Sequence, residues 1–270
     1  MAVVVAAVPL SASAVDPGSA PNAHHQAARI IAAELAMREA SSRVRALAAG
    51  KPSGLADSIR HELAVSAANY AFRQAARAEQ ARIYELAGYA SVQSSVMPLL
   101  PDGVQGPLGQ TIAGLHSLYI LGGIDQYYLV NPHYTHAYST AAPLSSLRAY
   151  YLEAQNLYGV DASYLASINY IESKFGRVNG PSSAGAQGPM QFLPSTWANW
   201  GNGGNINDPH ASILAAARYL VHYGAPYDMR TAIWHYNLSY DYVDSVEDFA
   251  RAYRADPTWL DRMYYWDTNG

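Results

Sequence analysis

Cysteine is absent from the 270-residue sequence, which excludes disulfide bonds, thiol nucleophiles, zinc fingers and iron–sulfur clusters. Charged residues are also scarce, since they form 14% of the chain against about 25% in an ordinary soluble domain. The net charge is −4, and without a clustered basic surface we expect no nucleic-acid partner. No apolar run reaches the roughly 20 residues that cross a bilayer, so we expect no integral membrane span.

Phenylalanine is the other scarce residue type, with 4 Phe against 22 Tyr and 5 Trp. Tyrosine and tryptophan carry a polar group on an apolar ring, so they suit wet, partly apolar surfaces such as sugar-binding clefts. Only Tyr70, Tyr84 and Tyr89 precede residue 99, and every Trp follows it. This shift in composition indicates two functional units.

The first unit is expected to be a helical hairpin. Residues 1–22 begin with a short apolar run and contain an A-x-A pattern, which indicates either a clipped export signal or a frayed terminus, because no basic residue precedes Arg29. Residues 23–97 are Ala-rich and predict two helices separated by the break at residues 50–54. The second helix has Leu55, Ile59 and Leu63 at i, i+4 spacing, as a packing stripe would.

A connector rich in Gly, Pro and Tyr is expected over residues 98–143, with a short buried helix from residue 112 to 124. His133 and His136 lie three residues apart, but no third ligand is near them in the sequence, so we interpret them as part of an ordinary loop. The NGGNIN segment has too few carboxylates for calcium, and we predict neither a metal site nor a cofactor.

Residues 144–270 carry dense helix start and stop signals and no clear strand pattern, which predicts an all-α domain. Candidate caps and ends are Ser145 or Ser146, Gly159, Asp161, Pro194, Asp208 with Pro209, Gly224 and Asp228. We therefore expect five to six short helices around one core.

One carboxyl is predicted to be buried. In the helix after Asp161, Glu172 lies on the same face as Leu165 and Ile168. Burial disfavours the charged form and raises the pKa of a carboxyl, as the general acid of glycosidic cleavage requires. The alternative interpretation is a structural Glu paired with an Arg.

A glycine-rich polar segment follows, FGRVNGPSSAGAQGPMQFLPSTW over residues 175–197, and a second aromatic group, WHYN, occupies residues 234–237. Together with Glu172, these segments are typical of a sugar cleft. Residues 171–173 (IES), 182–192 (SSAGAQGPMQF) and 235–237 (HYN) resemble the three motifs of lytic transglycosylases of the soluble type, and the FLPSTW and YNLSYDYV segments resemble the membrane-bound B-type branch. The resemblance covers roughly residues 145–255.

The resemblance implies a lysozyme-like catalytic domain after the Ala-rich hairpin. It further implies an exported cell-envelope enzyme that acts on peptidoglycan glycan strands. Such an enzyme cleaves the β-1,4 bond between N-acetylmuramic acid and N-acetylglucosamine and leaves 1,6-anhydromuramic ends. By the same resemblance Glu172 is the catalytic acid/base, and Tyr236 is its hydrogen-bond partner. The substrate-binding residues would be Ser182, Ser183, Met190, Gln191, Phe192, Tyr236 and Asn237. The hairpin could contact the cell wall or a second copy of the chain.

Two alternatives stay open at this point. One is a muramidase of the goose type that hydrolyses the same bond, and the other is a non-catalytic peptidoglycan-binding envelope protein. A two-carboxylate hydrolase fits poorly, because Asp208 and Asp228, the acids between Glu172 and Tyr236, are better explained as helix N-caps. We also expect the tyrosines between Tyr119 and Tyr151 to pack on the glycan groove or to extend it.

Overall fold

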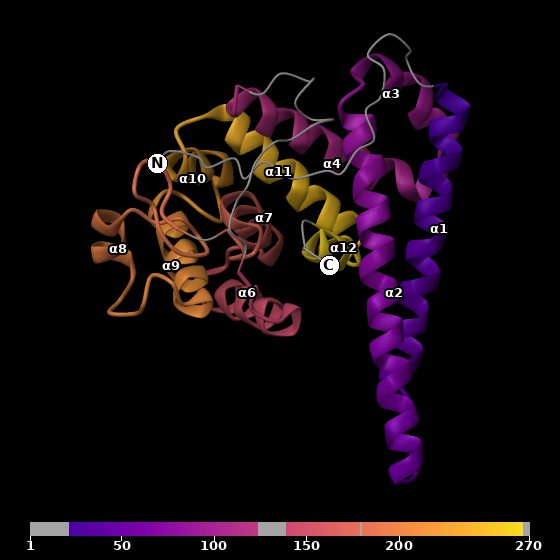
Figure 1. The fold of residues 1–270 in the computed structure, drawn as a ribbon. Coiled ribbons are helices and arrows are strands. Elements are labelled where there is room, and N and C mark those ends of the chain that lie inside the picture. Colours follow the sequence, from indigo (N-terminus) through magenta and orange to yellow (C-terminus); the bar gives the residue numbers. More distant parts are fainter. Residues whose placement is uncertain (1–21, 124–138, 179, 267–270) are drawn as a thin grey trace.

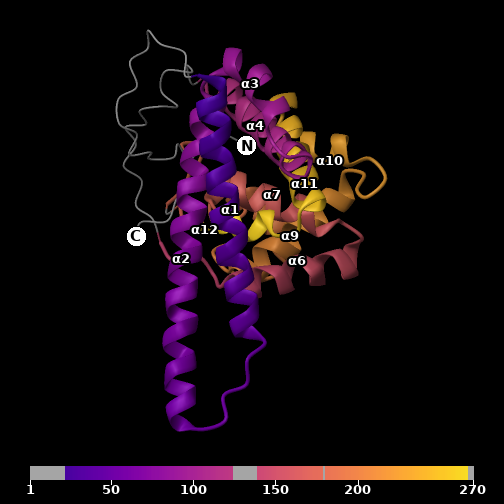
Figure 2. The ribbon, with the colours of Figure 1, turned by 90° about the vertical axis from the view of Figure 1, so that its right-hand side faces the viewer.

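The computed structural model describes residues 22–123, 139–178 and 180–266, and all the regular secondary structure within them is helical. One isolated antiparallel bridge joins Gln187 and Phe192. The predicted all-α class is therefore confirmed. A long helical hairpin, α1 and α2, stands beside a body of shorter helices, and its far end extends past that body (Figures 1 and 2). Of the N-terminal segment expected over residues 1–22, residues 1–21 lie outside the described residues.

The hairpin consists of α1 (Ala23–Ala48) and α2 (Leu55–Ala87), with the break where the sequence predicts it. Asn22 caps α1, because its side chain accepts hydrogen bonds from the amides of residues 24 and 25. The buried residues of α2 all lie from Ala68 onward. Leu55, Ile59 and Leu63 are 81%, 52% and 66% exposed, so the expected packing stripe is wrong for the start of α2. That part of the helix extends beyond the body, so the body does not cover it.

The segment expected as a connector contains more helix than predicted. After α3 (Ala90–Val96) and a 3₁₀ turn (Met97–Leu99), α4 runs over Asp102–Leu121 with Pro107 inside it. α4 packs along α11 (Tyr240–Ala255). A Cβ on Gly114 would lie 3.3 Å from the Phe249 ring, so this glycine allows the two helices to approach closely. Gly114, which looks like a loop signal in the sequence, is thus a contact position of a helix.

The body contains α6 (Leu144–Tyr158), α7 (Ala162–Ser173), α8 (Pro194–Trp200), α9 (Pro209–His222), α10 (Met229–Tyr236), α11 and α12 (Trp259–Tyr265). The side chains of Asp161, Asp208 and Asp228 cap α7, α9 and α10 as predicted. Gly159 ends α6 in the left-handed conformation, with φ at 73°, also as predicted. α6 begins after Pro143 rather than at a serine cap, and α12 is a helix that the sequence reading missed.

α7 lies at the centre of the body, in contact with α6, α9 and α11. Ten of its residues are buried, including Leu165, Ile168 and Ile171. A helix buried on most sides holds its polar residues in fixed surroundings, because close-packed neighbours leave them little freedom. The candidate acid is in the last turn of this helix.

A buried ion cluster joins α12 to the hairpin. The Arg262 guanidinium donates to Glu34 at 2.5 Å and to Glu79 at 2.7 Å, and its own side chain is 3% exposed. Asp256 accepts a further bond from Arg262 at 3.3 Å. Burial opposes ionisation of Glu34, but the bonds and charge of Arg262 outweigh it and lower the pKa of that carboxyl. Burial raises the pKa of Glu79 to about 8, so one carboxyl of the pair is ionised and the other is protonated near neutral pH.

Candidate active site

Glu172 is buried in the last turn of α7, with 4% of its surface exposed. The chain leaves the helix immediately afterwards through Lys174 and Phe175, both at positive φ, and then Gly176. Ser173 fixes this exit, because its hydroxyl accepts a bond from the amide of Gly176 and donates to the carbonyl of Pro189 at 2.5 Å. The burial predicted for Glu172 is confirmed.

Burial raises the pKa of Glu172 to about 7, and one hydrogen bond partly offsets this by lowering it. That bond is donated by the Tyr242 hydroxyl to Oε1 of Glu172, at 2.6 Å. Within the described part of the chain, no arginine pairs with Glu172, so the interpretation as a structural ion pair is not supported. A carboxylic acid that holds its proton up to about pH 7 can act as a general acid near neutral pH.

Tyr236 is not the hydrogen-bond partner of Glu172, and this expectation is wrong. The Tyr236 hydroxyl donates instead to the carbonyl of Met190 at 2.7 Å, because it reaches the glycine-rich loop rather than the end of α7. The residue that the motif reading missed is Tyr242, in the first turn of α11. The sequence feature that could have identified Tyr242 is its position in the YNLSYDYV segment, which resembles the membrane-bound B-type branch. The Tyr236 and Tyr242 rings are parallel, with centroids 6.4 Å apart, so the two tyrosines form one layer beside the acid.

The loop between α7 and α8 is held by its own backbone. The amides of Gln187 and Phe192 each donate to the other's carbonyl, at 2.8 and 3.0 Å. Between them, Gly188 and Gln191 have positive φ, at 74° and 49°. A Cβ on Gly188 would lie 1.9 Å from the carbonyl oxygen of Ile206, so only glycine fits there. Gln191 is buried, and its side-chain amide donates a hydrogen bond to the Gly188 carbonyl at 2.9 Å.

The other predicted binding residues lie at different depths. Ser182 is buried, and its hydroxyl accepts from the amides of residues 184 and 186, while Ser183 is exposed. Met190 and Phe192, expected as substrate-binding residues, have no exposed surface and form core beneath the loop. Asn237 is 5% exposed, and its Nδ2 has no partner among the described residues. Direct contact of these side chains with substrate stays a prediction.

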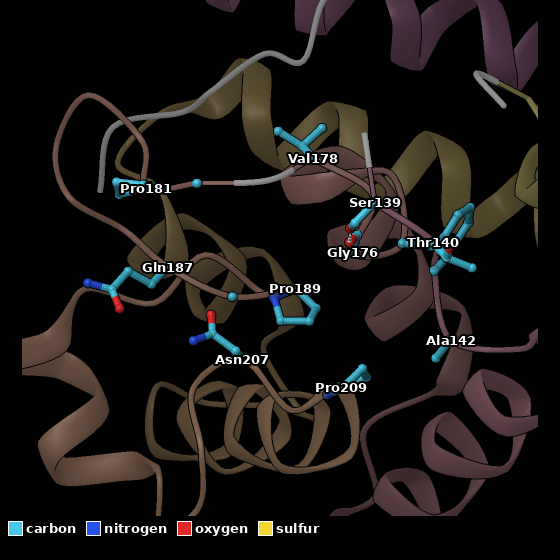
Figure 3. Close-up of a pocket in the computed structure, with 14 residues that line it drawn as sticks. Ser139, Thr140, Ala142, Gly176, Val178, Pro181, Gln187, Pro189, Asn207 and Pro209 are labelled. Carbon is cyan, nitrogen blue, oxygen red and sulfur yellow. Dashed lines mark hydrogen bonds between the residues drawn. The ribbon is translucent and has the colours of Figure 1, made fainter. Parts of the chain in front are cut away.

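A cavity of about 630 Å³ lies beside the same loop (Figure 3). Ser139 and Thr140 line one side of it, and Gln187 and Asn207 line the other. Its described lining contains no charged side chain, and Glu172 is not among the lining residues. We therefore assign the cavity no part in proton transfer.

Two sequence expectations concern residues near this region. Of the tyrosines expected to extend a glycan groove, Tyr151 is fully buried and Tyr119 packs against the core, so neither extends a surface. Tyr127, Tyr128, Tyr134 and Tyr138 lie outside the described residues, as do His133 and His136. In the described ranges, no three His, Asp or Glu side chains are grouped to hold a metal ion.

Comparison with known proteins assigns the body to a family. Residues 149–254 match the Transglycosylase SLT domain family. The chain is 32% identical over 127 residues to a protein named membrane-bound lytic murein transglycosylase F, from Thiobacillus denitrificans. This alignment covers 44% of the chain and 27% of that relative, so the chain matches about a quarter of the relative's length. No solved structure matches the chain. The match to the Transglycosylase SLT domain family therefore covers Glu172 and the loop beside it.

Proposed function

We propose that this protein is a peptidoglycan lytic transglycosylase that cleaves the β-1,4 bond between N-acetylmuramic acid and N-acetylglucosamine. One observation carries the proposal: Glu172 is a buried acid with its pKa raised to about 7, held by Tyr242. No other carboxyl of the described residues is among the causes of that raised pKa. A glycosidase with two catalytic carboxyls needs them about 5–9.5 Å apart.

The single carboxyl serves both steps of the proposed reaction. Protonated Glu172 first donates its proton to the glycosidic oxygen, and the bond between that oxygen and the anomeric carbon of muramic acid breaks. The Glu172 carboxylate then takes the proton of the C6 hydroxyl of the same sugar, whose oxygen bonds to the anomeric carbon. Acid is regenerated, no water is consumed, and the product is a 1,6-anhydro ring.

Tyr242 positions the acid in this scheme. Its hydroxyl holds Oε1 of Glu172, which leaves the second carboxyl oxygen to handle the proton. The parallel Tyr236 ring keeps Tyr242 in place, and Tyr236 is fixed in turn by the Met190 carbonyl. Proton transfer requires such fixed geometry, because the donor must lie within hydrogen-bond reach of the glycosidic oxygen.

We further propose that the protein acts in the cell envelope, where its substrate is found. In the described ranges, no helix has the length and apolarity needed for a membrane crossing. Contact of the hairpin with the cell wall or with a second copy stays a prediction.

The test is product analysis by mass spectrometry after incubation with purified sacculi. We expect anhydromuropeptides from the wild-type chain and none from Glu172→Gln, with both proteins giving the same circular dichroism spectrum. Products one water heavier would indicate a muramidase instead. Sacculus binding without any product from the wild-type chain would indicate a non-catalytic binding protein, and full turnover by Glu172→Gln would refute the assignment.

A further inference from the structure

Six aromatic rings form a continuous row across the ends of four helices, and we call this row the aromatic ladder. Its members, in spatial order, are Trp200, His222, Tyr223, His235, Trp234 and Tyr240. Successive ring centroids are 4.8, 4.7, 4.1, 5.2 and 6.5 Å apart. The ladder starts at the end of α8 and ends at the start of α11, on the side of the body away from the hairpin (Figure 1).

The ladder is connected to the candidate active site through one buried ring. Tyr219 contacts Trp200 and Tyr223 of the ladder, with centroids 5.9 and 4.8 Å away. Its hydroxyl donates to the carbonyl of His235 at 2.7 Å. On its other side it meets Tyr236 at 5.4 Å, and the Tyr236 ring is parallel to that of Tyr242. The ladder is therefore packed onto the same tyrosine layer that positions Glu172.

The ladder is accessible from solvent along its length. Tyr240 is 66% exposed, His222 is exposed, and the other four rings are half-buried. None of the six side chains contains a carboxylate, ammonium or guanidinium group. Packing below holds the rings in place, so a ligand that covers them has little side-chain entropy to remove.

We propose that the aromatic ladder binds the glycan strand of peptidoglycan beyond the bond that is cleaved. This inference rests on the proposed function and adds a binding surface to it. The C–H faces of β-linked hexosamines are apolar and their edges carry hydroxyl and amide groups, which matches rings with an apolar face and a polar edge. A row of rings suits a repeating polymer better than a small molecule, because successive sugars can each cover a ring. The absence of carboxylate, ammonium and guanidinium groups from the six side chains favours the neutral sugar backbone over charged stem peptides.

The ladder includes His235 of the HYN motif and residues on either side of that motif. His235 stands directly before Tyr236, and its ring lies over Tyr223 at an interplanar angle of 19°. Trp234 and Tyr240 flank the turn between α10 and α11, and α11 carries Tyr242 in its first turn. The ladder thus ends within two residues of Tyr242 in the sequence, at the start of the helix that holds Glu172 through the Tyr242 hydroxyl.

Binding is tested in the Glu172→Gln background, so that the substrate is not consumed. The probes are purified sacculi in a co-sedimentation assay and chitohexaose, a neutral β-1,4-linked N-acetylglucosamine oligomer, in calorimetric titration. Trp234→Ala and Tyr240→Ser should each weaken chitohexaose binding about fivefold, as the loss of one stacked ring implies. Trp234→Phe keeps a ring at that position and should bind within a factor of two of its parent.

The matched control is Tyr227→Ala, because Tyr227 is 97% exposed and makes no ring contact among the described residues. It should leave binding unchanged. Tyr240→Ser keeps the test valid if Trp234→Ala unfolds, since Tyr240 is an exposed side chain. Unchanged affinity in Tyr240→Ser and Trp234→Ala, or binding that falls steeply with salt, would overturn the proposal.

A failure of the proposed function would look different. It would appear as absence of released products from the wild-type chain with sacculi, while the binding titrations in the Glu172→Gln background would still report on the ladder. If products form and the ladder variants bind normally, only the ladder proposal is lost. If the ladder variants bind poorly and no products form, the ladder stands and the catalytic proposal is lost.

Discussion

At the scale of single residues, the burial of Glu172 imposes a cost on the folded protein. Its pKa of about 7 in the folded state exceeds the ordinary value of 4.5 that it regains on unfolding. The contribution of a group with a raised pKa is fully present below the unfolded pKa, and it is lost as the pH rises through the folded pKa. The wild-type protein therefore loses stability between about pH 4.5 and pH 7 because of this one side chain.

Glu172→Gln should consequently stabilise the protein at neutral pH while it removes activity. Glutamine has no proton to lose, and its carbonyl can accept the bond from Tyr242. The gain over wild type should be near zero at pH 4.5 and roughly 2–3 kcal/mol at pH 8. Urea unfolding at both pH values measures it. An equal difference at the two pH values would show that the pKa of Glu172 is not raised.

Tyr242 and Tyr236 differ by their hydrogen-bond partners, and this difference predicts distinct pH profiles. The bond from Tyr242 lowers the pKa of Glu172, so Tyr242→Phe should raise that pKa and move the alkaline limb of kcat/KM to higher pH. Tyr236→Phe loses a bond to the Met190 carbonyl and should leave the limb near pH 7. Muropeptide release across pH 5–9 gives both profiles. An identical shift in the two variants would contradict the assignment of Tyr242.

At the scale of elements, the loop between α7 and α8 depends on a glycine that no other residue can replace. Gly188→Ala should cost at least about 3 kcal/mol, since the new Cβ meets backbone at 1.9 Å. Gly180 also has positive φ, at 97°, but no atom lies within 4 Å of a Cβ there. Gly180→Ala should therefore cost only about 1 kcal/mol, from backbone strain alone. Thermal unfolding of both variants makes the comparison, and equal losses would contradict it.

The individual helices also show how much of the fold can be predicted from the sequence. Capping side chains are local signals, so Asp161, Asp208 and Asp228 predict their helices correctly. Helix periodicity likewise places Glu172 in the core. α4 could not be predicted as a whole, because its glycines and Pro107 are helix breakers by local propensity and packing against α11 overrides them. The hydrogen-bond partner of Glu172 depends on how α11 packs against α7. No local sequence pattern specifies that packing.

At the scale of the whole molecule, the hairpin and the body are joined by an ion cluster with a single buried arginine. Arg262→Met would remove the guanidinium that contacts both Glu34 and Glu79 and leave Glu34 with Arg38 of its own helix, and breaking a buried pair costs about 3–5 kcal/mol. The loss should be larger at pH 8 than at pH 5, since both carboxyls can be protonated in acid. Limited proteolysis of the hairpin, together with urea unfolding, measures the effect.

Glu79→Gln is the matched control for this cluster. Glu79 is already protonated near neutral pH, because its pKa is raised to about 8, so an amide replaces an uncharged acid. Little destabilisation is expected at pH 5. Relative to wild type, the variant should gain stability as the pH rises from 4.5 through 8, the range over which the contribution of the raised pKa is lost. A loss as large as that of Arg262→Met would show that Glu79 is the ionised member.

The ion cluster also sets an order of events during synthesis. Glu34 and Arg262 are 228 positions apart, and Glu79 and Arg262 are 183 apart, so a ribosome releases both acids long before the arginine. Until α12 has been made, Glu34 has only Arg38 of its own helix as a partner and Glu79 lacks Arg262, so burial of these carboxyls is costly. Completion of the contact between the hairpin and the body is thus a late step, which waits for the residues after α11. A nascent chain halted before Arg262 would carry a helical arm whose final contact has yet to be synthesised.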